Sequence, residues 1–174
     1  MLITSINNGI RKVLEGVLTL FMAVMVAAVV WQVFTRFILQ DPSSFTDELS
    51  RYMLIWIGIL GGAYTYVIKR HLALDMLVHK LQARGRRILS IIINTIIMMF
   101  SAVTLGYGGW TLMSNTLKNG QISPGIFIGD HHLLIGYVYV VVPLAGALIC
   151  YFGLIDILTA LLNPSNNEHP EESR

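Results

Sequence analysis

FTDELSRYMLIWIGILGGAYTYVIKRHLALDML, residues 45–77, begins with acidic residues, continues as an apolar run and ends in a basic segment. The apolar run, residues 49–68, reaches about 20 residues, the length that an α-helix needs to cross the hydrocarbon core of a bilayer. Because polar groups of opposite charge flank the run, the stretch predicts a membrane-spanning helix with a defined orientation.

Three more apolar runs lie outside this stretch, at residues 13–35, 88–113 and 133–158. The whole chain is 55% hydrophobic and only 13% charged, with a mean hydropathy of +0.66, which is too apolar for a soluble domain. We therefore predict an all-α integral membrane protein, with four transmembrane helices forming one domain over residues 1–162. Residues 163–174 are polar and acidic and are predicted to form a disordered tail.

Lysine and arginine are concentrated on one side of the four predicted helices. Such residues accumulate on the cytoplasmic side of membrane proteins, so we expect both termini in the cytoplasm and interpret the basic patch as a topology signal, with no role in binding nucleic acid. The basic side carries Arg11, Lys12, Lys69, Arg70, Lys80, Arg84, Arg86 and Arg87, and the other side only Arg36, Arg51 and Lys118.

Residues 71–84 form an amphipathic stretch between the second and third predicted helices. Leucine and valine side chains recur at helical spacing on one face, which predicts a short helix lying in the cytoplasmic membrane interface. His71, Asp75 and His79 share another face. Because no fourth ligand lies nearby, we favour a hydrogen-bond network there over a metal site.

Asp47, Glu48 and Arg51 form the strongest polar cluster at the opposite end of the second predicted helix. Arg51 follows Asp47 by four residues and Glu48 by three, so one helix face can pair them. Ser44 and Asp47 resemble a capping box, which predicts a helix start near Ser44. The cluster is either a helix cap with a surface ion pair or a contact for a partner. A catalytic carboxylate pair is disfavoured because no nucleophile or metal cluster lies near it in the sequence.

Small residues and proline mark possible packing sites. Gly58, Gly61 and Gly62 allow close approach of another helix, either within the chain or from a partner. Pro143 is expected to bend the fourth helix or loosen its hydrogen bonds. An outer loop is expected over residues 114–132, before that helix, and Asn119-Gly120 and Pro124-Gly125 are turn signals within it.

Ionisable groups inside the predicted helices are few. Glu15 and Asp156 lie near the cytoplasmic ends, and the remaining polar groups are too sparse for a solute pathway, although they can hydrogen-bond between helices. These groups are Gln32, Thr65, Asn94, Thr95 and Ser101. One alternative is a self-sufficient, proton-coupled exporter that uses Glu15. A haem or quinone bundle is disfavoured because all five histidines lie outside the apolar runs.

The order of these motifs resembles the DctQ-like small membrane subunit of tripartite ATP-independent periplasmic (TRAP) transporters over residues 13–162. Phe45, Asp47 and Arg70 depart mildly from that family's usual residues. The matching positions are Arg36, Phe45-Thr46-Asp47-Glu48, Arg51, Trp56, Gly61, His71 and Asp75, followed by Ser123-Pro124, Tyr137, Pro143 and Gly146.

The resemblance implies a non-enzymatic, multi-pass subunit of the bacterial inner membrane without a cofactor of its own. Its expected partners are lipids, a large DctM-like subunit that holds substrate and Na⁺, and a periplasmic substrate-binding protein. The imported organic acid, such as sialic acid or a dicarboxylate, is left undetermined. The interface or structural candidates are Arg36, Asp47, Glu48, Arg51, Trp56, Gly58, Gly61, Gly62, His71, Asp75 and Pro143.

Overall fold

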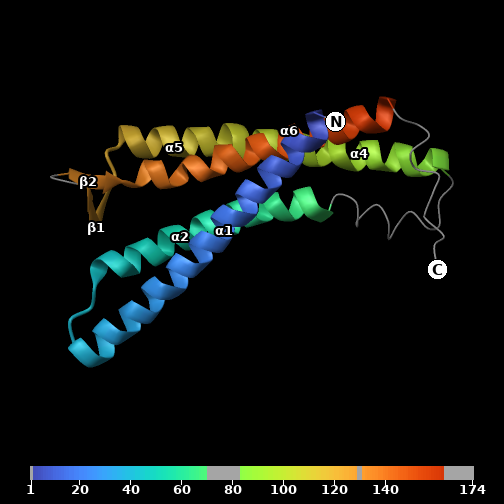
Figure 1. The fold of residues 1–174 in the computed structure, drawn as a ribbon. Coiled ribbons are helices and arrows are strands. Elements are labelled where there is room, and N and C mark those ends of the chain that lie inside the picture. The colour runs from blue at the N-terminus through green and yellow to red at the C-terminus, as the bar shows by residue number, and fades with distance from the viewer. Residues whose placement is uncertain (1, 70–82, 129–130, 163–174) are drawn as a thin grey trace, which may run out of the picture.

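The structure is a computed structural model that describes residues 2–69, 83–128 and 131–162 (Figure 1). Four helices in this part of the chain are long and apolar enough to cross a membrane, as predicted. They cover Asn7–Leu39, Ser44–Ile68, Ile88–Lys118 and Ile135–Thr159. The tail and residues 71–82 of the predicted interfacial helix, with His71 and Asp75, lie outside the described residues.

The first two spans form a helical hairpin. Helix α1 (Leu2–Phe34) continues as a π-helical segment, η1 (Thr35–Leu39). Gln40 ends it in the left-handed conformation, with φ 55°, and donates its backbone N–H to the Thr35 carbonyl. Helix α2 (Ser44–Lys69) begins at the predicted residue. The turn between them is therefore short, and α1 and α2 pack along each other.

The third span is a continuous rod of three segments: α4 (Ala83–Ser101), the π-helical η2 (Ala102–Gly108) and α5 (Gly109–Lys118). The fourth span consists of a 3-10 segment, η3 (Ile135–Val140), and α6 (Val141–Leu162). Pro143 lies in the first turn of α6, three residues after the end of η3, so the proline lies where the fourth span changes from a 3-10 helix to an α-helix. A bend at this residue stays a prediction.

The segment between the third and fourth spans is a β-hairpin, which the sequence analysis expected as an outer loop. Asn119-Gly120 forms a turn, as predicted, with Gly120 at φ 60°. Strand β1 (Ile122–Ile128) then pairs antiparallel with β2 (His131–Leu134). The prediction of a turn at Pro124-Gly125 was wrong, because both residues lie within β1, where the pairing register is irregular.

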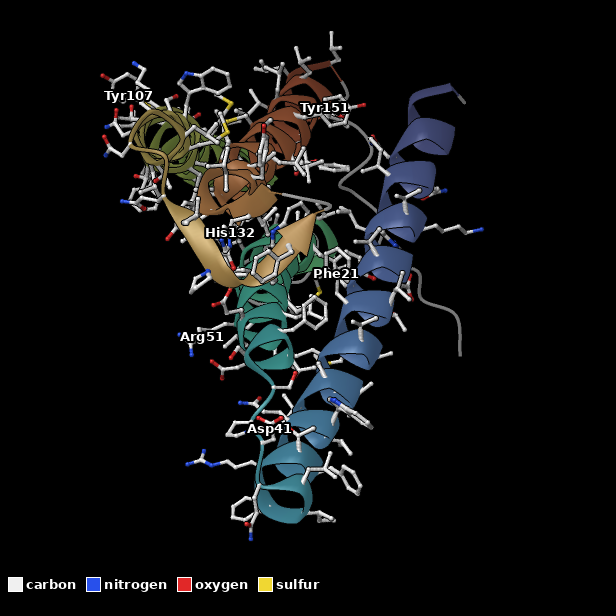
Figure 2. All side chains as sticks on the ribbon, turned by 90° about the vertical axis from the view of Figure 1, so that its left-hand side faces the viewer. Phe21, Asp41, Arg51, Tyr107, His132 and Tyr151 are labelled. Carbon is white, nitrogen blue, oxygen red and sulfur yellow. The ribbon has the colours of Figure 1, made fainter. Side chains whose placement is uncertain are left out.

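Helix α2 lies at the centre of the arrangement. It packs against α1 on one side and α6 on another, and α6 in turn packs against α4 and η2. In Figure 1, α1 runs obliquely across the other helices, and Figure 2 shows it to one side of them. Leu14, Leu60 and Val141, from three different helices, form the buried core cluster. Trp56 packs edge-on against Phe21, with ring centroids 5.6 Å apart, and so belongs to the α1–α2 contact.

Glycine allows a close contact between α6 and the third span. A Cβ added at Gly146 would lie 2.8 Å from the backbone nitrogen of Gly106 and 3.0 Å from Cβ of Leu105. In contrast, a Cβ at Gly58, Gly61 or Gly62 would meet nothing within 4 Å. Close packing inside the chain therefore involves Gly146. The three α2 glycines make no close helix contact with other described residues, so the first of the two alternatives, packing within the chain, is not observed for them.

We predict that Gly146→Ala lowers the free energy of unfolding by about 1–3 kcal/mol, because the new methyl group overpacks the contact with η2. Gly58→Ala is the matched control: its methyl group enters open space, and alanine favours a helix over glycine by up to about 1 kcal/mol. Thermal unfolding of the purified chain in detergent measures both. Equal stability of the two variants would contradict the close contact at Gly146.

Candidate functional site

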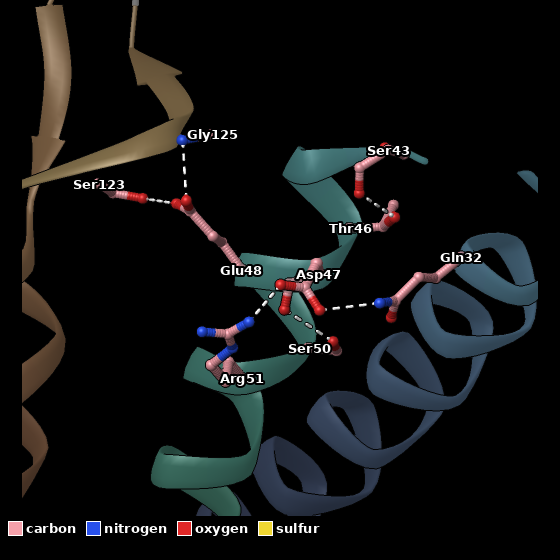
Figure 3. Close-up of polar contacts among 9 residues, drawn as sticks. All are labelled: Gln32, Ser43, Thr46, Asp47, Glu48, Ser50, Arg51, Ser123 and Gly125. Atoms are coloured by element: carbon pink, nitrogen blue, oxygen red, sulfur yellow. Dashed lines mark hydrogen bonds and ion pairs between the residues drawn. The ribbon is translucent and has the colours of Figure 1, made fainter. Parts of the chain in front are cut away.

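The polar cluster predicted around Asp47 lies at the end of the molecule that carries the β-hairpin, here called the hairpin end. Three elements meet there: the last turns of α1, the first turns of α2 and strand β1 (Figure 3). The structure therefore adds residues from both neighbouring elements to the three that the sequence analysis singled out.

Asp47 connects α2 to α1. Its Oδ1 accepts a hydrogen bond from Nε2 of Gln32 at 2.8 Å, and its Oδ2 pairs with the Arg51 guanidinium (Figure 3). The interhelical role expected for Gln32 is thus confirmed. The predicted capping box was wrong, because the Asp47 carboxylate binds these two side chains instead of the start of the helix. Arg51 is 69% exposed, so the ion pair lies at the surface.

Glu48 connects α2 to the hairpin. Its Oε2 accepts a hydrogen bond from the Ser123 hydroxyl, and its Oε1 accepts one from the Gly125 backbone N–H at 3.0 Å. Ser123 is completely buried. A Cβ at Gly125 would lie 2.9 Å from the Ser44 carbonyl oxygen, so β1 can approach α2 this closely only because residue 125 is a glycine. Arg51, which the spacing also allowed to pair with Glu48, binds Asp47 instead.

His132 stabilises the hairpin behind this contact. Its Nδ1 lies 3.1 Å from the Ser123 carbonyl oxygen, within hydrogen-bond distance, and its ring lies 4.4 Å from the ring of Phe127. Glu48 and His132 thus hold Ser123 from two sides, one at its hydroxyl and one at its backbone.

A cleft of about 460 Å³ opens beside the Asp47 and Glu48 carboxylates. The end of the first span, the start of α2 and the irregular part of β1 form its walls. The lining residues are Gln32, Arg36, Pro42, Ser43, Ser44, Asp47, Glu48, Pro124 and Gly125. Arg36, predicted as an interface residue, therefore lies with both carboxylates around one opening.

Polar groups deeper in the spans bond to helices. Tyr66 of α2 donates its hydroxyl to Oδ1 of Asn94 of α4 at 3.2 Å, while Thr65 and Thr95 bond to carbonyls of their own helices. Ser101 Oγ is buried and has no hydrogen-bond partner among the described residues. Glu15 is exposed on α1 and is not among the residues that line the cleft, so the exporter alternative gains no support from its position.

Metal chemistry has no candidate site in the described ranges 2–69, 83–128 and 131–162, since no group of three or more His, Cys, Asp or Glu side chains there could hold an ion. The His71, Asp75 and His79 face lies outside those ranges.

Sequence reasoning did not connect Ser123 and Gly125 to Glu48. The dipeptides Ser123-Pro124 and Pro124-Gly125 were noted, the first as part of the family resemblance and the second as a turn. Neither indicated a contact with α2, because 75 residues separate Ser123 from Glu48 along the chain.

We predict that Glu48→Ala destabilises the hairpin by about 1–3 kcal/mol, because it removes the acceptor of a buried hydroxyl and of a backbone N–H. Hydrogen exchange at Gly125 should become faster and the chain should unfold at a lower temperature. Asp41→Ala, which removes an exposed carboxylate from the same end, is the control and should change neither quantity. Identical exchange in the two variants would show that Glu48 does not hold the hairpin.

Comparison with known proteins matches this architecture to one family. The family model of the tripartite ATP-independent periplasmic transporters, DctQ component, matches residues 25–163. A Haemophilus influenzae protein assigned as a TRAP transporter small permease protein is 30% identical over 115 residues, which are 66% of this chain and 71% of that protein.

Two further relatives carry substrate names. The sialic acid TRAP transporter small permease protein SiaQ of Vibrio cholerae is 30% identical over 110 residues, 62% of this chain and 61% of SiaQ. The ectoine TRAP transporter small permease protein TeaB of Halomonas elongata is 30% identical over 166 residues, 94% of this chain and 80% of TeaB. The family match covers most of the chain, including the last three spans and the second half of the first. The chain therefore belongs to the DctQ family, the small permease subunits of TRAP transporters, and is not an enzyme.

Proposed function

We propose that this chain is the non-catalytic small subunit of a sodium-coupled TRAP importer for an organic acid. In this proposal a large membrane subunit holds the substrate and Na⁺, and a periplasmic protein delivers the substrate. The small subunit packs on the scaffold of the large one and helps to keep it in place in the inner membrane.

The observation that carries the proposal is that polar groups within the spans form hydrogen bonds within or between the helices of this chain. Tyr66, Asn94, Thr65 and Thr95 bond to other helices or to their own, and a continuous series of polar groups across the bilayer is not seen in the described spans. The helices meanwhile expose large apolar side chains along α1 and α4, which suits contact with lipid and with another membrane subunit.

The substrate class rests on the family resemblance alone. Relatives are named for sialic acid and for ectoine, so subunits of this type serve transporters of different solutes. If the large subunit selects the solute, as we propose, this chain should be compatible with more than one substrate class.

The orientation follows from the charge distribution. We propose that the hairpin end faces the periplasm and both termini face the cytoplasm, since lysine and arginine are concentrated at the other end. A cysteine placed at the exposed Asn119, in a chain carrying Cys150→Ala, tests this orientation. It should react with a membrane-impermeant maleimide in intact spheroplasts, and a cysteine at the exposed Asn8 should not; the opposite pattern would reverse the topology.

Reconstitution tests the division of labour. We expect liposomes that contain this chain alone to take up no sialic acid, dicarboxylate or ectoine, with or without a sodium gradient. Liposomes that contain the chain, its co-expressed large subunit and the binding protein should take up the cognate solute only with an inward sodium gradient. Uptake by the isolated chain would overturn the supporting role, and uptake by the complex without sodium would overturn the coupling.

Arg51→Ala tests whether the Asp47–Arg51 pair belongs to a subunit contact. Because Arg51 is largely exposed, the pair should contribute no more than about 1 kcal/mol to the isolated chain, less than the 1–3 kcal/mol expected of a desolvated pair. We predict unchanged thermal unfolding of the chain but weaker co-purification with the large subunit and lower uptake. Lys118→Ala is the control for the loss of an exposed cation. If assembly and uptake are unchanged, the pair is only a surface contact.

A further inference from the structure

The cleft at the hairpin end is lined by a cationic side chain, Arg36, that takes no part in the contacts described above. Arg36 lines the cleft, is exposed and has no hydrogen bond or ion pair with any described residue. Ser43 and Ser44 line it too, and their side-chain hydroxyls are likewise unpaired within the described part of the chain. One guanidinium and two hydroxyls are thus available to a ligand with anionic oxygens.

The same cleft contains two carboxylates whose positions are already fixed. Gln32 and Arg51 hold Asp47, while Ser123 and Gly125 hold Glu48 (Figure 3). A carboxylate oxygen can accept more than one hydrogen bond, so both groups can still receive bonds from a ligand. Because their partners come from the protein itself, they need little reorganisation to bind an ammonium group.

The cleft lies at the depth where a membrane surface is expected. Its residues come from the end of the span Asn7–Leu39 and the start of the span Ser44–Ile68. Exposed aromatic side chains surround this level, and such residues are enriched at the boundary between headgroups and hydrocarbon. They are Trp31, Phe34, Phe37 and Phe45.

We propose that the cleft binds the headgroup of phosphatidylethanolamine. Arg36 and the two serine hydroxyls bind the phosphate, and Asp47 and Glu48 accept hydrogen bonds from the ammonium group, while the acyl chains lie along the exposed aromatic residues. The volume of about 460 Å³ lies within the roughly 300–1,000 Å³ typical of small-ligand sites.

The charges select this headgroup over the other common ones. Phosphatidylglycerol carries the phosphate but no cation, so the two carboxylates repel it. Phosphatidylcholine carries a cation without N–H donors, so it cannot donate hydrogen bonds to Asp47 and Glu48. A phosphate and a primary ammonium a few bonds apart match both halves of the cleft.

Native mass spectrometry of the delipidated full chain tests the proposal with an equimolar mixture of the three lipids. We expect phosphatidylethanolamine adducts to exceed the others at least about five-fold, the factor of one net hydrogen bond. Arg36→Gln removes a partner of the phosphate that all three lipids share, so it should lower the retention of phosphatidylethanolamine. It should leave unfolding in lipid-free detergent unchanged, because Arg36 has no partner among the described residues. Lys118→Gln, which removes an exposed cation outside the cleft, should retain the lipid.

Four results would overturn the proposal. The first is equal retention of the three lipids, and the second is undiminished retention of phosphatidylethanolamine by Arg36→Gln. The third comes from a photoreactive residue at Ser43 in the assembled transporter: crosslinking to another protein in place of lipid would assign the cleft to a subunit contact. The fourth comes from the same measurements with free phosphoethanolamine. If this compound raises the unfolding temperature of the chain but the lipid is not retained, the cleft binds a water-soluble ligand and the proposal is overturned.

Discussion

At the hairpin end, the Glu48 carboxylate connects the α1–α2 pair of helices to the β-hairpin between the third and fourth spans. It belongs to α2, which packs along α1, and it binds the hairpin that connects α5 to the fourth span. Further along α2, the Tyr66–Asn94 hydrogen bond joins α2 to α4. Lipid gives little hydrophobic driving force for helix association, so polar bonds and close packing have to hold such helices together. The position of α2 at the centre of the fold follows from these two bonds and the Leu60 core contact.

The sequence predicted the helices well because membrane crossing sets a simple length requirement. Four apolar runs of sufficient length produced four helices, and the start of α2 at Ser44 followed from local residue types. The hairpin was missed because Pro124 and Gly125 are locally turn residues. Their strand conformation depends on a distant partner, Glu48, and on the space that a glycine leaves beside Ser44. Pro143 was placed in the correct helix, but its effect depends on where α6 begins, which hydropathy does not determine.

The candidate site was predicted only in part, because local spacing predicts contacts within one helix and does not predict contacts between distant segments. Asp47 and Arg51 are one helical turn apart, so their pairing could be read from spacing, and the structure contains it. The separate role of Glu48 could not be read in this way, because adjacent residues on a helix point in different directions. Asp47 faces α1, whereas Glu48 faces β1. Two neighbouring carboxylates that looked like one cluster therefore hold two different elements.

Two groups of glycines in the described part of the chain have different physical roles. Gly125 and Gly146 lie where a side chain would collide with backbone atoms of another element, so the fold of this chain accounts for them. Gly58, Gly61 and Gly62 lie on α2 with open space where a side chain would be, although glycine weakens a helix interior by up to about 1 kcal/mol relative to alanine. Contacts within the described chain do not explain that cost. Lipid alone does not explain it either, since acyl chains adapt to a larger side chain. A rigid helix packed closely on α2 does require small residues there, which fits the proposed packing of this chain against the large membrane subunit.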